Sequence, residues 1–143
     1  MKNLHIFNVT NRTDPILDEL YCEPAGVGPN DFPKNYLDSK TGDNIIHKDP
    51  YYAEYIFHYW FWKNQLMNYE KSSWIGFCQY RRYWLNENSD QNLIITRENL
   101  KDNMLKDIPS IWSNHETVVA KRVYVNNPKF MKLIKRGFKN IIS

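Results

Sequence analysis

Runs of apolar residues along the chain predict two buried strands. Residues 4–9, LHIFNV, form a short β-rich run that opens into the polar segment 10–12. Residues 73–80, SWIGFCQY, predict a central strand that is apolar on both faces and ends at two arginines. Since open α/β sheets bind ligands where strands end, the residues after each strand are candidates for a site.

A helix rich in aromatic residues is predicted between these strands. Asp49 and Pro50 predict its start, because Asp caps free N–H groups and Pro suits the first helical position. We expect it to run over residues 50–67. Eight of the twelve residues from Tyr51 to Trp62 are aromatic, so the helix is apolar almost all round. We therefore predict that it is the buried core helix, that it packs on the 73–80 strand and that Trp60 is buried.

The remaining segments are more polar. Prolines and glycines interrupt every period over residues 24–43 and predict a long loop. Residues 93–96 predict a short strand, residues 97–106 a polar helix and residues 118–125 another strand. Residues 127–143 predict a basic amphipathic terminal helix that begins at an Asn-Pro pair. The alternation of strands and helices predicts an α/β layered fold.

Composition favours a globular protein of one domain over residues 1–143. Hydrophobic residues make up 42% and charged residues 24%, and no apolar run reaches the roughly 18 residues of a membrane span. The N-terminus lacks the features of a signal peptide, so we expect a cytoplasmic protein. Cys22 and Cys78 sit in no CxxC pair, which argues against a disulfide framework and a thiolate zinc site. Both are expected to be buried thiols.

Charge is concentrated at the C-terminal end. Residues 118–143 carry seven Lys/Arg and no acid, whereas residues 1–117 carry 12 Lys/Arg and 16 Asp/Glu. This imbalance indicates an anionic partner, or a solvated basic helix face. Because the terminal helix is amphipathic, we predict peripheral contact with an anionic membrane; docking on the domain is the competing use of its apolar face.

Three groups of polar residues are candidates for chemistry. Arg81 and Arg82 follow the second strand, and their planar forks match phosphate oxygens; an ordinary ion pair and a solvated arginine are the alternative. Glu54 and His58, four residues apart, share a helix face. They need a cleft or each other, because burying unpaired polar groups costs roughly 2 to 7 kcal/mol. A hydrogen-bonded core pair is the alternative, and a metal site would lack a third ligand.

The third group, Asp43 and Asn44, follows Gly42 in a turn. Its oxygens suit a metal ion or ribose hydroxyls, and they suit an ordinary turn equally well. The motifs GxGxxG, GxxxxGK[ST], GxSxG, HExxH and DxD are all missing, so nucleotide-fold dehydrogenases, P-loop enzymes, elbow-type serine hydrolases and zincins have no support. No RNA-recognition consensus occurs, and we expect no nucleic-acid partner, although arginines beside aromatic residues leave base stacking as a third hypothesis.

Four segments together resemble a known family. They are IFNVTNR at 6–12, GDNI at 42–45, DPYYAEYIFHYWFWKN at 49–64 and WIGFCQYRRYW at 74–84. The combination is similar to an uncharacterised domain family of bacterial capsular polysaccharide and lipopolysaccharide biosynthesis proteins, described as glycosyltransferase-like. Clear similarity covers residues 4–84. In two respects the chain departs from the pattern: Gln79 stands where the family usually has His, and the chain stops at Ser143, so we expect a domain that is incomplete at its C-terminus.

The resemblance implies a GT-A-like fold, that of nucleotide-diphospho-sugar transferases, and transfer of a sugar from a nucleotide-sugar donor to a polysaccharide or lipid-linked acceptor. It implies catalytic roles for Glu54 and Asp43. The substrate-binding residues implied by the motifs and the helix face are Asn44, Tyr51, His58, Tyr80, Arg81 and Arg82. Arginines can neutralise a diphosphate without a metal, so no cofactor is predicted with certainty, and Mn or Mg stays open despite the missing DxD. The alternative is a non-catalytic module that binds nucleotide or carbohydrate.

Overall fold

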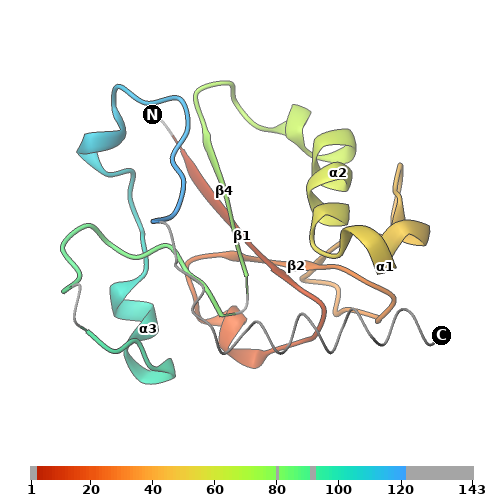
Figure 1. The fold of residues 1–143 in the computed structure, drawn as a ribbon, viewed down its shortest axis with the longest axis horizontal. Helices are drawn as coiled ribbons and strands as arrows, with labels where there is room; N and C mark the ends of the chain where they lie inside the picture. Colours follow the sequence, from red (N-terminus) through yellow and green to blue (C-terminus); the bar gives the residue numbers. More distant parts are fainter. Residues whose placement is uncertain (1–2, 80, 91–92, 122–143) are drawn as a thin grey trace, which may run out of the picture. The chain divides into compact units, whose positions relative to one another are not determined.

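A four-stranded parallel sheet is the centre of the fold (Figure 1). The computed structural model describes residues 3–79, 81–90 and 93–121. The strands are β1 (Leu4–Thr10), β2 (Glu23–Gly26), β3 (Leu37–Asp38) and β4 (Trp74–Gln79), in the order β3-β2-β1-β4. Every neighbouring pair in this order is parallel. The α/β fold predicted from the sequence is therefore confirmed.

Strand predictions from the apolar runs are confirmed for β1 and β4, whereas two strands were missed. β2 and β3 lie within or at the edge of residues 24–43, which were predicted as loop. β2 contains Pro24 and Gly26, both poor strand formers, and exists because its backbone pairs with β1. β3 has two residues and pairs only with β2 among the described strands. Pairing between distant segments overrides the local signals here.

The predicted long helix is broken into pieces, so that prediction was wrong in its continuity. Helix α1 (Asp49–Tyr52) ends at Ala53, and helix α2 (Tyr55–Asn64) follows. Ala53 has a φ of 47°, a conformation rare for a residue with a side chain, and it turns the chain between the two helices. A short 3-10 turn, η3 (Leu66–Asn68), follows α2.

Burial of the aromatic helix was overestimated. Only one face of α2 is buried, and it consists of Ile56, Phe57, Trp60 and Phe61. The exposed aromatic residues of α1 and α2 are Tyr51, Tyr52, Tyr55 and Trp62. The buried face packs on the sheet, and within the described part of the chain no segment covers the four exposed side chains.

Aromatic rings join α2 to the sheet. The Phe61 ring lies 4.7 Å from the Phe7 ring of β1 and 5.5 Å from the Phe77 ring of β4, measured between centroids. Trp60 is 2% exposed, and its Nε1 donates a hydrogen bond to the Thr41 carbonyl oxygen at 2.7 Å. The predictions that this helix packs on β4 and that Trp60 is buried are therefore confirmed.

A second cluster of buried residues contains Ile6, Cys78 and Leu105, with Trp84 and Trp112 packed against it. Helix α3 (Arg97–Asn103) begins where the predicted 97–106 helix does and ends earlier. Cys78 is buried as predicted, while Cys22 is half-buried. The remaining short helices are the 3-10 turns η1 (Pro15–Asp18), η2 (Ile46–Lys48) and η4 (Ser110–Trp112).

Some predictions fail or fall on undescribed residues. Residues 93–96 form no strand; they precede α3, where the Thr96 N–H donates to Asn99 Oδ1 at 2.8 Å. Residues 118–121 form no strand either, and residues 122–125 and the predicted basic helix over 127–143 lie outside the described part of the chain. The chain divides into two compact units, residues 1–113 and 114–143. The single domain expected from composition stays a prediction.

Membrane-spanning segments were searched among the described residues. None of their helices is both long enough and apolar enough to cross a bilayer.

Candidate functional site

The strand order creates a topological switch point between β1 and β4. From β1 the chain builds β2 and β3 on one side and then returns to place β4 on the other. Val9 of β1 pairs with Gln79 of β4, so both strands end at the same edge of the sheet. In open parallel sheets, ligands bind outside the carboxyl ends of the strands at such a point.

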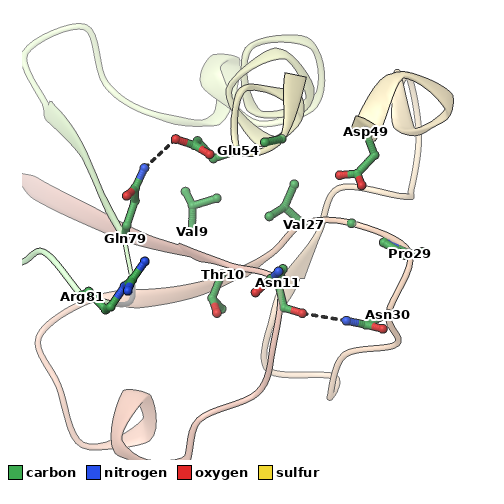
Figure 2. Close-up of a pocket in the computed structure, with 12 residues that line it drawn as sticks. Val9, Thr10, Asn11, Val27, Pro29, Asn30, Asp49, Glu54, Gln79 and Arg81 are labelled. Carbon is green, nitrogen blue, oxygen red and sulfur yellow. Dashed lines mark hydrogen bonds between the residues drawn. The ribbon is translucent and has the colours of Figure 1, made fainter. Parts of the chain in front are cut away.

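A cavity of about 450 Å³ lies at this edge, and we name it the switch-point cavity (Figure 2). It is lined by Val9, Thr10, Asn11, Val27, Gly28, Pro29, Asn30, Asp49, Ala53, Glu54, Gln79 and Arg81. Its volume falls within the range of roughly 300 to 1,000 Å³ that is typical of small-molecule sites. The residues come from the ends of β1, β2 and β4 and from the α1–α2 junction.

The break at Ala53 brings two carboxylates to the cavity. Asp49 begins α1 and Glu54 immediately precedes α2. In a continuous helix, residues five apart would point about 140° away from each other. Because Ala53 interrupts the helix, both Asp49 and Glu54 line the cavity, as Figure 2 shows.

Glu54 is held by the end of β4. Gln79 Nε2 donates a hydrogen bond to Glu54 Oε1 at 2.7 Å. This contact joins the helix and the strand at the wall of the cavity (Figure 2). Arg81, two residues after Gln79, lines the same cavity. A cation and a carboxylate thus border one space, which suits a ligand with an anionic group and hydroxyl groups.

The other side of the cavity is built from amides and from Gly28 in the segment after β2. Asn30 Nδ2 donates to the Asn11 carbonyl oxygen at 2.8 Å, which ties the loop after β2 to the end of β1. Gly28, with a φ of 93°, lies against Asp49: a Cβ there would stand 3.7 Å from Asp49 Oδ1. The sequence analysis did not predict these residues individually. The signal that pointed to this region was the polar segment 10–12, which follows directly after a buried strand.

Arg81 also borders a second cavity of about 410 Å³, which we name the α3-side cavity. It is lined by Asp14, Ile16, Arg81, Tyr83, Leu85, Ile95, Thr96, Arg97 and Leu100. Arg97 forms an ion pair with Asp14. Burial raises the pKa of Tyr83 to about 12, so its phenol keeps its proton at neutral pH. Arg81 is therefore common to two spaces on the carboxyl side of the sheet.

A third, smaller cavity of about 210 Å³ is also lined by Glu54, and we name it the Tyr55 cavity. It shares Val9, Glu54 and Gln79 with the switch-point cavity. Its remaining lining residues are Tyr55, His58, Phe77 and Cys78. The Glu54–Gln79 contact thus lies at a wall common to both cavities.

His58 in this cavity is surrounded in a way that favours a neutral imidazole. Burial lowers its pKa below the ordinary value, which favours the uncharged ring at pH 7. Its Nδ1 lies 3.0 Å from the Glu54 carbonyl oxygen. Because a carbonyl oxygen only accepts hydrogen bonds, we assign the proton to Nδ1, which leaves Nε2 as an acceptor. The predicted Glu54–His58 pair therefore meets through the Glu54 backbone, and the carboxylate bonds to Gln79 instead.

Comparison with known proteins identifies the family. The family model described as "Domain of unknown function (DUF4422)" matches residues 5–138. The chain belongs to the DUF4422 family. Searches of the curated proteins and of the solved structures found no match. DUF4422 is uncharacterised, so the link to capsule and lipopolysaccharide glycosyltransferases stays a prediction.

In this DUF4422 chain, Glu54 and Arg81 line the switch-point cavity, and His58 lines the Tyr55 cavity, which also includes Glu54. Tyr51 is 85% exposed, and it lines none of the three named cavities in the described part of the chain. Arg82 is exposed, and its backbone pairs with that of Gln79. Tyr80 lies outside the described residues.

The predicted pair Asp43 and Asn44 lines none of the three cavities; Asp43 is anchored to α2, and Asn44 is bonded to the backbone of its own turn. Tyr59 Oη donates to Asp43 Oδ1 at 3.2 Å, and Asn64 Nδ2 donates to the Asp43 carbonyl oxygen at 2.8 Å. Asn44 Nδ2 donates to the Lys40 carbonyl oxygen at 3.0 Å. Within the described part of the chain, these contacts give the turn a structural role, which was the alternative weighed from the sequence.

Metal-binding clusters were searched among the described residues as well. They contain no group of three or more His, Cys, Asp or Glu side chains placed to hold a metal ion.

Proposed function

We propose that this chain is a glycosyltransferase domain that transfers a sugar from a nucleotide-sugar donor to a polysaccharide or lipid-linked acceptor. One observation carries the proposal: Arg81 and Glu54 border the same cavity at the switch point of a parallel sheet. The sheet order supports the GT-A-like fold implied by the resemblance, since dinucleotide-binding sheets place their strands in the same 3-2-1-4 order and bind at the carboxyl ends of strands 1 and 4.

Arg81 is the group we assign to the diphosphate. Sugar transfer breaks the bond between the anomeric carbon and the diphosphate oxygen, so negative charge develops on the leaving nucleoside diphosphate. A guanidinium fork can hold two of its oxygens at once and stabilise that charge. The position of Arg81 at the common wall of two cavities fits a diphosphate, which has a substituent at each end.

Glu54 determines which end of the donor lies in which cavity. A base must reach the acceptor hydroxyl where it attacks the anomeric carbon. We therefore place the donor sugar in the switch-point cavity beside Glu54 and the nucleoside in the α3-side cavity. In the transfer step, the acceptor oxygen bonds to the anomeric carbon, the diphosphate leaves, and Glu54 takes the hydroxyl proton. We give Asp43 and Asn44 no part in this step, because neither residue lines the switch-point cavity or the α3-side cavity.

A non-catalytic module that binds nucleotide or carbohydrate is the second candidate. One observation favours it: Gln79 occupies one oxygen of Glu54, and an amide cannot take up or release the proton that a base must pass on. A chain of this kind would keep the cavities and bind the donor without turning it over.

Nucleotide titration tests the proposal. Calorimetry with UDP, GDP, CDP, ADP and TDP should find one that binds, and Arg81→Ala should weaken it by about 10- to 100-fold, the loss of a charged hydrogen bond. Arg81→Lys should recover only part of the affinity, since an ammonium group cannot reproduce the fork. Lys71→Ala is the matched control, because it removes one positive charge just before β4, at the opposite edge of the sheet.

Turnover then separates the two candidates. With the matching sugar nucleotides and water as the acceptor, the chain should hydrolyse the donor and release nucleoside diphosphate. Glu54→Gln should still bind the donor but should release nucleoside diphosphate at least about 100-fold more slowly. Binding without release from any sugar nucleotide would favour the binding module. Failure of all five nucleotides to bind, or unchanged affinity in both Arg81 variants, would contradict the proposed function.

A further inference from the structure

The Tyr55 cavity has no role in donor binding as proposed above, yet it adjoins the proposed base. It meets the switch-point cavity at Glu54, Gln79 and Val9. At about 210 Å³ it is smaller than the 300 Å³ or so at which drug-sized pockets begin, which leaves room for about one sugar ring. A group bound there would share the Glu54 wall with the donor sugar.

An exposed aromatic ring forms one wall of this cavity. Tyr55 is 65% exposed, and its ring centroid lies 5.5 Å from that of His58, with a 40° angle between the planes. The His58 and Phe77 ring centroids lie 4.4 Å apart, with an angle of 64° between the planes. A large aromatic ring left in water beside a cavity is suited to cover the C–H face of a pyranose, which is apolar and flat.

A hydrogen-bond acceptor lies beside this ring. His58 Nδ1 bonds to the Glu54 carbonyl oxygen, so the imidazole is fixed in place and presents Nε2. Glu54 and Gln79 add a carboxylate and an amide to the same walls. Sugar hydroxyl groups donate and accept hydrogen bonds, and they are complementary to this mixture of acceptors and an amide.

We infer that the Tyr55 cavity is the subsite for a neutral pyranose of the acceptor, which stacks on Tyr55 and donates a hydroxyl hydrogen bond to His58 Nε2. Calling this sugar the acceptor rests on the proposed function, in which Glu54 is the base that takes a proton from the acceptor hydroxyl. Sugar binding itself can be measured without any nucleotide.

Saturation-transfer NMR provides that measurement. The probes are the methyl pyranosides of glucose, galactose, N-acetylglucosamine and rhamnose, each presented at millimolar concentration to the full chain. At least one should receive saturation. Tyr55→Ala should weaken its binding about tenfold or more, the loss of a stacked ring, and His58→Phe should weaken it severalfold through the lost acceptor. Tyr52→Ala is the control, since Tyr52 is an exposed tyrosine of α1 that lines none of the three cavities.

Nucleotide affinity of the same variants shows that they are folded. Tyr55→Ala and His58→Phe should bind the nucleoside diphosphate as the unchanged chain does. No saturation of any pyranoside, or saturation that both variants leave unchanged, overturns the inference even where nucleotide binding is intact. Failure of every nucleotide to bind overturns the proposed function separately, since the pyranoside experiment contains no nucleotide.

Discussion

Trp60→Ala is the substitution that most directly tests how α2 is held to the domain. Trp60 is 2% exposed, its ring lies 5.4 Å from that of Phe57, and its Nε1 donates to the Thr41 carbonyl oxygen at 2.7 Å. Removing a large aromatic side chain from a core costs about 3 to 5 kcal/mol, as a lost transfer term and a residual cavity. We expect the free energy of unfolding to fall by that amount.

Trp60→Phe separates the hydrogen bond from the packing. It keeps an aromatic ring and removes Nε1, so it should cost about 1 to 2 kcal/mol for the lost hydrogen bond and the missing ring atoms. The bond joins α2 to the turn that contains Asp43, so its loss should also loosen that turn. The two variants together apportion the contribution of this residue.

Urea unfolding followed by far-UV circular dichroism is the assay, because tryptophan fluorescence would change with the substitution itself. Trp62→Ala is the control on the same helix: Trp62 is 56% exposed and contacts Lys63. Its replacement should cost at most about 1 kcal/mol, as is usual for a surface cation–π contact. If Trp60→Ala cost no more than Trp62→Ala, the packing of α2 on the sheet described above would be wrong.

Three further predictions concern other parts of the chain. Burial lowers the pKa of His58, so the unfolded state takes up a proton before the folded state does as the pH falls below about 6.5. The free energy of unfolding should therefore drop between pH 7.5 and pH 5.5. The drop should be smaller in His58→Gln, which has no imidazole at this position. Gly42→Ala should cost more than about 1 kcal/mol in urea unfolding, since Gly42 has a φ of 56° and a Cβ would stand 2.2 Å from Asn64 Oδ1; an unchanged midpoint would contradict this. The membrane contact of the basic tail over residues 127–143 stays a prediction. The chain should co-sediment with anionic vesicles at low salt, because each cation near an anionic surface adds about 1 kcal/mol to the binding free energy. Equal binding to neutral and anionic vesicles, or binding to neither, would rule out this contact.

Local sequence alone determined the elements whose apolar residues form one continuous run. The apolar runs of β1 and β4 are strands, and the aromatic segment is a helix that buries Trp60. The position of Arg81 just after a strand was also readable, because a buried strand ends where charged residues begin. In each case a few neighbouring residues contain the whole signal, since a strand buried on both faces is a short apolar run and a buried helix is a longer one.

Only the tertiary structure decided how distant segments meet. β2 exists through pairing with β1, despite Pro24 and Gly26, and the turn at Asp43 is held by side chains of α2. The break at Ala53 was not visible in a segment made of good helix and core residues, yet it brings Asp49 and Glu54 to one cavity. Such features depend on contacts across many residues of sequence, whose free energies outweigh the small local propensities. The sequence therefore showed where the separate strands end, whereas the candidate site forms only where those ends meet at the edge of the assembled sheet.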